Sequence, residues 1–334
     1  MSGPHDLFVR YTFGHPERAA AELRAALPSH VSAQVDWDSL RPESGSVVDP
    51  ELRKTETDLL FSARLRTGQS LLLYVLLEHQ SSVDRWMAWR MLRYVVRWVE
   101  SWRQAHPEGT RLPVIIPLVM YHGAEGTWTA PRRVEELFDL PEEEGAREHW
   151  RALVPHFEYL LDDLTAEREE ALRARPGSPL VRLTWLALRY GRTAELAHRL
   201  PGWTVLLAQV QAAPDGAENL RTIIHYLLSI GDSTARQVTR QVLHSVVDAQ
   251  RAEELMRSWG EELMERGMRR GMARGKAEGR AEDVLRILAA RGFHVTDEIR
   301  QRILSCTDIS TLDRWFDRAL KASKLSNVLG DLTQ

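Results

Sequence analysis

The most constraining feature of the chain is an apolar run that ends in a carboxylate. Residues 70–79 read SLLLYVLLEH, so nearly every position up to Leu77 is apolar, and Glu78 and His79 close the run. An unbroken apolar segment of this length is typical of a central strand that is buried on both faces. Such a strand needs helices to cover it. The run therefore predicts an α/β core.

The segments around this run predict the other elements of the core. Residues 16–27 are rich in Ala, Glu, Arg and Leu and are expected to form a helix. Residues 57–66 form a strand-like segment, and the Thr-Gly-Gln triplet after it predicts a tight hairpin into residues 70–79. Residues 113–122 predict a further buried strand, and Pro117 within it indicates a sheet edge or a bulge. The order of these elements is typical of a mixed sheet.

Residues 84–103, between these strands, give the clearest helical pattern. An apolar stripe recurs at helical spacing, at Met87, Met91, Val95, Trp98 and Trp102. Arg90, Arg93 and Arg97 form a separate stripe, which would either contact phosphates or be a solvated face paired with acids. Trp86 and Trp89 beside it are expected to pack in the core, and base stacking is the alternative.

The second half of the chain is predicted to be helical. Residues 251–280 have the pattern of one long charged helix, in which Gly267, Gly271, Gly275 and Gly279 recur at every fourth position. Such a stripe permits close approach of helix backbones, so the helix is a connector or a self-association element, and DNA contact is the alternative. Residues 282–325 predict three short helices. The last of these would have a capping box at residues 310–313 and an apolar face formed by Leu312, Trp315, Phe316, Ala319 and Leu320.

The charge balance excludes a uniformly basic nucleic-acid coat. The chain has 44 basic and 47 acidic residues and a net charge of −3. Residues 121–164 carry the acidic excess, whereas residues 266–280 are strongly basic, so local contact with DNA remains compatible with the total. The single cysteine, Cys306, excludes an internal disulfide and a cysteine-rich zinc site. No apolar run approaches the ~20 residues of a membrane span, so we expect a cytoplasmic protein with no membrane partner.

The candidate catalytic residues lie at the open end of the predicted hairpin, away from the turn. Asp58 opens the first strand, Glu78 and Gln80 close the second, and ten residues lie on either side of the turn at Gly68. Two carboxylates at one sheet edge, with the backbone carbonyl of His79, would suit Mg²⁺. The alternative is that Glu78 is a solvated or paired carboxylate at the end of a strand. His5, His79 and His122 are interpreted as structural rather than as general bases.

An ordered series of motifs resembles a known family over roughly residues 3–165. The series resembles the Rpn recombination-promoting nucleases, also called YhgA-like putative transposases, which have a PD-(D/E)XK nuclease core. The similar stretches are residues 4–8 (PHDLF), 35–37 (VDW), 57–60 (TDLL), 77–81 (LEHQS), 90–94 (RMLRY), and 112–114 (LPV) through 121–123 (YHG). The glycine-repeat helix and the helical unit after it also resemble tails common in such proteins.

This resemblance implies a Mg²⁺-dependent DNA endonuclease, with Mn²⁺ as an alternative metal. Asp58, Glu78 and Gln80 would be catalytic, and Asp58, Glu78 and the carbonyl of His79 would hold the metal. Gln80 stands where many PD-(D/E)XK nucleases have lysine, so it would orient water or phosphate without supplying positive charge. Asp6 is an additional candidate, whereas Asp49 and Glu56 are more typical of surface residues. Arg90, Arg93 and Arg97 would bind DNA.

The predicted organisation has four parts. These are a nuclease core (1–165), a helical region (166–250), a connector helix with the glycine repeat (251–281), and a small C-terminal helical domain (282–334). A homo-oligomer would form through the connector helix. The competing interpretations are a DNA-binding protein that keeps the fold but cleaves weakly or not at all, acting in recombination or mobile-element defence, and an oligomerising protein whose acids pair with arginines.

Overall fold

The computed structural model describes residues 3–43, 59–67, 70–71, 78–80, 82–124, 126–322 and 324–329. It divides the chain into two compact units, Met1–Leu255 and Met256–Gln334. The predicted nuclease core and the predicted helical region therefore both lie within the first unit, and most of the connector helix lies in the second.

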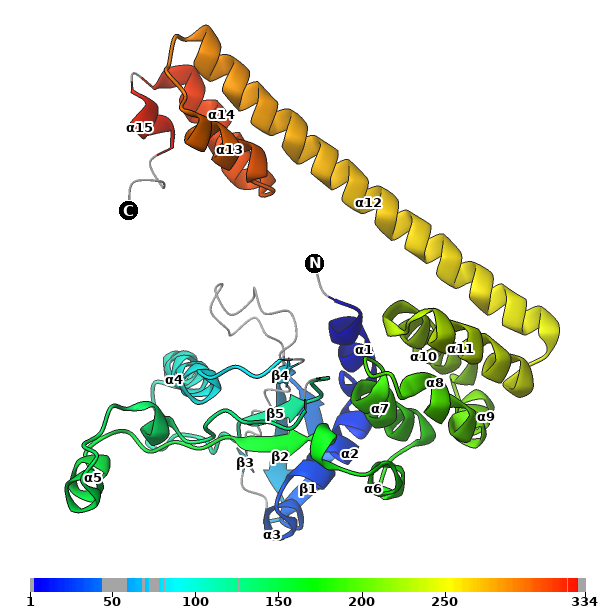
Figure 1. The fold of residues 1–334 in the computed structure, drawn as a ribbon. Coiled ribbons are helices and arrows are strands. Elements are labelled where there is room, and N and C mark those ends of the chain that lie inside the picture. Colours follow the sequence, from blue (N-terminus) through cyan, green and yellow to red (C-terminus); the bar gives the residue numbers. More distant parts are fainter. Residues whose placement is uncertain are drawn as a thin grey trace. The chain divides into compact units, whose positions relative to one another are not determined.

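The first unit combines short strands with many helices (Figure 1). Its strands are β1 (Val35–Pro42), β2 (Phe61–Leu65), β3 (Ser70–Leu71), β4 (Glu78–Gln80), β5 (Leu118–Tyr121) and β6 (Leu160–Asp163). Its α-helices up to the last strand are α1 (Pro4–Phe13), α2 (Pro16–Ala26), α3 (Ser29–Ser32), α4 (Met87–Ala105) and α5 (Glu144–Arg151). Those that follow are α6 (Glu169–Ala174), α7 (Pro179–Tyr190), α8 (Leu196–Arg199), α9 (Thr204–Ala212), α10 (Gly216–Ile230) and α11 (Ser233–Val246). The 3₁₀ turns among the described residues of this unit are η3 (Val134–Leu137), η4 (Leu164–Ala166) and η5 (Leu200–Trp203).

The strands form two sets whose pairing agrees with a mixed α/β architecture. β1, β2 and β3 are antiparallel, and the pairs Ala63↔Leu71 and Arg64↔Ser70 confirm the predicted hairpin. β4, β5 and β6 are parallel. The predicted strand 70–79 thus pairs with β2 at its beginning and with β5 at its end.

The expectation for Pro117 was wrong. β5 begins directly after this proline and is the middle strand between β4 and β6, not an edge strand. Proline has no N–H for a ladder bond, but its carbonyl still accepts a hydrogen bond from the Leu160 amide at 2.8 Å. Pro117 therefore marks the start of a central strand, and all four residues of β5 are buried.

The apolar stripe of α4 forms one side of the core, as predicted. Met87, Met91 and Trp98 are buried and pack in one cluster with Val119 of β5. α4 lies on one side of the strands, and α1, α2 and α7 lie on the other (Figure 1). The expectation for the two tryptophans before and within this helix was wrong, because Trp86 is 57% exposed and Trp89 is 47% exposed.

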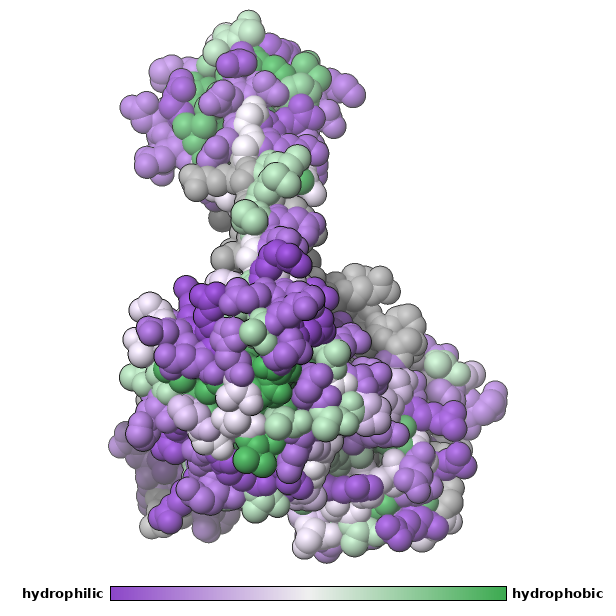
Figure 2. All heavy atoms as spheres, turned by 90° about the vertical axis from the view of Figure 1, so that its right-hand side faces the viewer, coloured by the Kyte–Doolittle hydropathy of each residue, from purple (hydrophilic) through white to green (hydrophobic). Residues whose placement is uncertain are grey.

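The N-terminal helices pack against the helices that follow the last strand. α2 contacts both β6 and α7, and α1 contacts α7 and α10. A buried hydrogen bond of 3.1 Å joins the hydroxyls of Thr12 and Thr184. α1 and α2 therefore connect the strand region to the helical region. The face of the molecule in Figure 2 is mainly hydrophilic with scattered hydrophobic residues, and no described helix is both long and apolar enough to cross a membrane.

The second unit is helical, as predicted. The long helix α12 (Ala249–Ala290) is followed by α13 (Asp297–Ser305), α14 (Ile309–Lys321) and α15 (Leu325–Val328). Its core includes Leu288, Ile303, Leu312, Trp315 and Ala319, whereas Leu320 is half exposed. The predicted capping box was misplaced: Asp308 caps α14, and its carboxylate accepts hydrogen bonds from the amides of Ser310 and Thr311.

Candidate active site

The strand that carries the predicted catalytic residues lies at the edge of the parallel set. Glu78 pairs with Val119, His79 with Met120 and Gln80 with Tyr121. Because parallel strands share a direction, the carboxyl ends of β4, β5 and β6 meet at one edge of the sheet. Asp58 lies outside the described residues, so its approach to Glu78, and the metal coordination by both, stay predictions.

Asp163, the last residue of β6, lies at the same edge and pairs with Tyr121 of β5. Its carboxylate accepts hydrogen bonds from the Trp128 amide at 2.8 Å, the Thr165 amide at 2.9 Å and the Thr165 hydroxyl at 2.6 Å. Asp163 therefore caps η4. It also holds the loop that follows β5, at Trp128, against the end of β6. These contacts fix the backbone at the edge where β4 ends.

Helix α1 brings the N-terminal candidates towards the end of β5. His5 lies with its ring centroid 5.1 Å from that of His122, the buried residue that follows Tyr121. Nδ1 of His5 is 2.8 Å from the hydroxyl of Tyr226. Asp6 accepts a hydrogen bond from the Gly3 amide at 2.7 Å. Since Tyr121 pairs with Gln80, the start of α1 lies near the strand end that sequence reasoning chose for the site.

The three arginines of α4 differ in their surroundings. Arg90 binds Asp84 at 2.9 Å and its side chain is 27% exposed, so it follows the interpretation in which the stripe pairs with acids. Arg93 is exposed and has no ion-pair partner in the described part of the chain, and Arg97 is partly exposed. Arg93 is thus the member of the stripe best placed to meet a phosphate.

The described residues contain no group of three or more His, Cys, Asp and Glu side chains arranged to hold a metal ion. The donor set proposed from the sequence consists of carboxylate and carbonyl oxygens, the ligands that Mg²⁺ prefers. The fit of this donor set to Mg²⁺ therefore depends on the two carboxylates, Asp58 and Glu78.

Sequence reasoning missed a buried charged cluster on the other side of the strands. Asp162 of β6 forms a two-bond ion pair with Arg175, at 2.6 and 2.8 Å, and both side chains are buried. Arg175 also binds Glu167 and lies 5.1 Å from the centre of the Trp185 ring. The Trp185 indole N–H donates to Glu22 of α2 at 2.5 Å. These contacts join α2, β6 and α7 behind the sheet.

Glu22 is the unusual member of this cluster. It is completely buried, and its Oε1 atom has no hydrogen-bond partner among the described residues. Burial raises the pKa of Glu22 well above its ordinary value, and the nearby charge of Asp162 raises it further, against the lowering effect of Arg175. The folded protein therefore favours a protonated Glu22.

Protonation of Glu22 predicts a pH-dependent stability. Because its pKa is higher in the folded state than in the unfolded state, its contribution is lost as the pH rises above the ordinary carboxyl range. Glu22→Gln keeps a side-chain oxygen that can accept the Trp185 N–H but cannot ionise, so it should flatten the fall in the free energy of unfolding between about pH 5 and about pH 8. Urea denaturation across this range measures the effect, and parallel curves for both proteins would contradict it.

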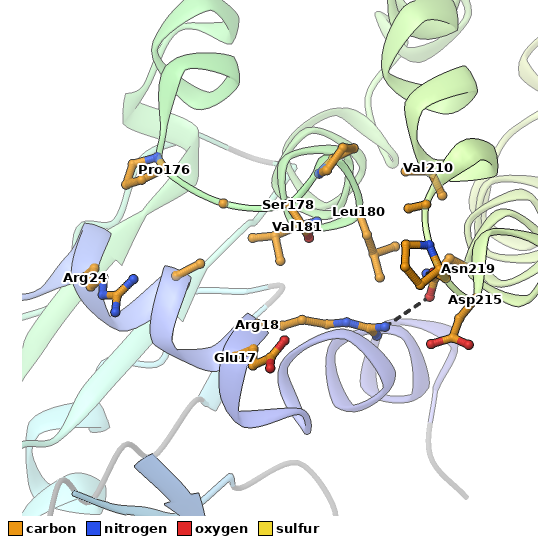
Figure 3. Close-up of a pocket in the computed structure, with 15 residues that line it drawn as sticks. Glu17, Arg18, Arg24, Pro176, Ser178, Leu180, Val181, Val210, Asp215 and Asn219 are labelled. Atoms are coloured by element: carbon orange, nitrogen blue, oxygen red, sulfur yellow. Dashed lines mark hydrogen bonds between the residues drawn. The ribbon is translucent and has the colours of Figure 1, made fainter. Parts of the chain in front are cut away.

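A pocket of about 380 Å³ lies between α2, α7 and the start of α10 (Figure 3). Arg18 points across it and donates to Asn219 at 3.2 Å. Acidic and basic side chains line it in equal number, with Glu17 and Asp215 on the one hand and Arg18 and Arg24 on the other. None of the predicted site residues lines it, so the pocket adds no residue to the candidate active site.

Together the fold and the strand-end residues define an α/β protein with its candidate chemistry at the carboxyl edge of a parallel strand set. The family model of the putative transposases, YhgA-like, matches residues 3–218. The chain therefore belongs to the YhgA-like putative transposase family. This confirms the resemblance on which the site residues were chosen.

Similar proteins are named both as nucleases and as inactive nuclease-like proteins. The recombination-promoting nuclease RpnD of Escherichia coli O157:H7 is 30% identical over 231 residues, which are 69% of this chain and 83% of the relative. RpnA of Escherichia coli K12 is 33% identical over 127 residues, 38% of this chain and 42% of the relative. The inactive recombination-promoting nuclease-like protein RpnE of the same strain is 26% identical over 312 residues, 93% and 96% of the two chains. No solved structure matches the chain.

Proposed function

We propose that the chain is a metal-dependent DNA endonuclease that hydrolyses phosphodiester bonds. The observation that carries the proposal is the placement of Glu78 and Gln80 in β4, in register with β5, within a chain whose relatives are named recombination-promoting nucleases. The approach of His5 to His122 supports a contribution of Asp6 from α1. A PD-(D/E)XK core and a role in recombination are parts of the same proposal.

Asp58, Glu78 and the carbonyl of His79 would hold Mg²⁺, or Mn²⁺ in its place. When bound, the metal would lower the pKa of a water ligand and neutralise charge on the scissile phosphate. Gln80 would orient that water or a phosphate oxygen through its amide. Arg93 would hold the DNA backbone, with Arg97 beside it and Arg90 bound to Asp84.

Nicking of supercoiled plasmid DNA by the full chain tests the proposal. Nicked product should appear with Mg²⁺ or Mn²⁺ and disappear with EDTA. Binding of DNA without any cleavage would favour the second candidate, a DNA-binding protein that keeps the fold. A specific observation favours that candidate, because RpnE, which is similar over 93% of this chain, is named inactive.

We also propose that α12 mediates self-association with a second copy of the chain. Met264, Met268 and Met272 are 64–70% exposed, at a spacing of four residues. A side chain added at Gly260, Gly275 or Gly279 would meet nothing within 4 Å, so the helix backbone is accessible at these positions. Exposed methionines beside glycines form the kind of surface on which a second helix can pack closely.

The charges along α12 favour an antiparallel partner. Acidic residues lie before Met268, the middle methionine, at Glu261, Glu262 and Glu265. The basic residues of the glycine repeat lie after it. An antiparallel copy would place the acidic part of each helix beside the basic part of the other, whereas a parallel copy would align like charges. With the pair centred between residues 267 and 268, each Met264 would lie opposite Gly271 of the other copy.

Disruption of the methionine surface should convert a dimer to a monomer. The double change Met264→Lys and Met268→Lys places positive charges opposite the basic repeat of the other copy without touching a buried residue. Leu320→Lys is the control, because Leu320 is also exposed in the same unit but lies outside α12. Sedimentation equilibrium of the full chain measures the mass. A monomeric wild type, or a double variant that stays dimeric, would reject the interface.

A further inference from the structure

Two large aromatic side chains lie in solvent at the beginning of α4. Trp86 is 57% exposed and Trp89 is 47% exposed, while Met87 and Met91 on the opposite face of the helix are fully buried. Val83, just before the helix, is 39% exposed. Tryptophan usually buries most of its surface, so two neighbouring exposed indoles indicate a binding surface rather than a core.

The turn that carries Trp86 is held in place by its own contacts. One carboxylate oxygen of Asp84 accepts a hydrogen bond from the Trp86 amide at 2.8 Å. The other accepts from the guanidinium of Arg90 at 2.9 Å. Asp84 thus joins the turn to the first turns of the helix. This arrangement fixes the backbone from which the indole projects, which lowers the entropy cost of binding through it.

The charges around the two indoles favour a polyanion. Arg85 and Arg93 are exposed and have no ion-pair partner in the part of the chain that the structure describes. Arg85 adjoins Trp86 in the chain, and Arg93 lies one helical turn beyond Trp89. A second copy docked through the same face would bring these arginines against each other. Aromatic faces with flanking arginines are instead the elements that bind single-stranded nucleic acid, through base stacking and phosphate contact.

The surface also lies close to the candidate catalytic strand along the chain. Only residues 81–86 separate Gln80, the last residue of β4, from the start of α4. α4 packs on the strands through the cluster that contains Val119, the residue paired with Glu78. DNA held at the end of β4 would therefore pass near the N-terminal end of α4.

We infer that Trp86 and Trp89 stack on unpaired bases, so that the preferred substrate is DNA with a single-stranded region beside the cleaved bond. The inference rests on the proposed endonuclease function for its biological meaning. Stacking requires base faces that a continuous duplex conceals, and it is insensitive to base identity because every base has a π-face. Trp86 and Trp89 would thereby select the structure of the DNA rather than its sequence.

Binding measured without cleavage tests this inference. A fluorescent single-stranded oligonucleotide and the matching duplex are titrated with the full chain in EDTA, and anisotropy gives the dissociation constants. Trp86→Ala and Trp89→Ala should each weaken single-strand binding roughly 5- to 150-fold, the equivalent of about 1–3 kcal/mol per stacked base. Duplex affinity should change little, and Trp86→Phe should keep most of the single-strand affinity because it retains an aromatic face.

The chain offers a matched control in Trp150, which is 56% exposed in α5. Trp150→Ala should leave both dissociation constants unchanged. Unchanged single-strand binding in both test variants, or an equal loss on duplex, would overturn the inference. A change of sedimenting mass in Trp86→Ala or Trp89→Ala would also overturn it, because the surface would then bind a second copy. Since EDTA prevents metal-dependent cleavage, these results are independent of whether the wild type nicks plasmid DNA.

Discussion

Replacement of Glu78 by alanine should abolish metal-dependent nicking of supercoiled DNA. Glu78 is the carboxylate of β4 and pairs with the buried central strand at Val119. If it holds the metal, its removal takes away several kcal/mol of transition-state stabilisation, which corresponds to a fall in rate of roughly 10²- to 10⁴-fold. Initial rates of nicking with saturating Mg²⁺ measure the effect.

Asp58→Ala should cause a loss of similar size, since both carboxylates serve one metal. The double variant should then be hardly slower than either single variant, because groups that act as one unit have non-additive effects. Glu100→Ala is a suitable control, as Glu100 is an exposed carboxylate on the neighbouring helix α4. Equal nicking by the wild type and the Glu78 variant would remove Glu78 from the site. DNA binding that persists in both single variants would show that the loss lies in the chemistry.

The parts of the fold that could be predicted are those with a local pattern. The hairpin of β2 and β3 follows from a turn between two apolar segments, and α4 from an apolar residue at nearly every helical turn. The same periodicity already separated Trp86 and Trp89 from the stripe of Met87 and Met91. The burial of the two tryptophans was expected from residue type alone. The helical periodicity, which places them off the buried face, was the better guide to their exposure.

The parts that could not be predicted depend on residues far apart in the sequence. β6 contains only Leu160–Asp163, and its two acidic residues give it no strand pattern. The burial of a charged residue at Asp162 is explained only by its contacts with residues distant in the sequence. Arg175 pairs with it from beyond η4 and α6, and Glu22 of the N-terminal helix α2 lies beside it. Each of these charges is typical of a surface when considered alone. Only the packing of α2, β6 and α7 makes them a buried cluster.

That cluster predicts the largest effect on stability. Arg175→Met removes both hydrogen bonds to Asp162 and the contact with Trp185 but keeps much of the side-chain volume. Asp162 would then be a buried carboxylate beside Glu22 with no cation to balance it. Loss of one partner of a buried ion pair typically costs about 3–5 kcal/mol. We expect a decrease of this size in the free energy of unfolding, measured by urea denaturation with tryptophan fluorescence.

Two further variants separate the charge effect from a general sensitivity of the fold. Arg133→Met removes an exposed ion pair with Glu158 and should cost at most about 1 kcal/mol. Asp162→Leu combined with Arg175→Met removes the unbalanced charge as well, and should recover part of the lost stability because apolar groups can replace a buried ion pair. A single Arg175 variant within about 1 kcal/mol of the wild type would contradict the role of the pair. A double variant less stable than the single one would show that Asp162 contributes through contacts other than Arg175, and the link between α2, β6 and α7 would then depend on packing rather than on charge.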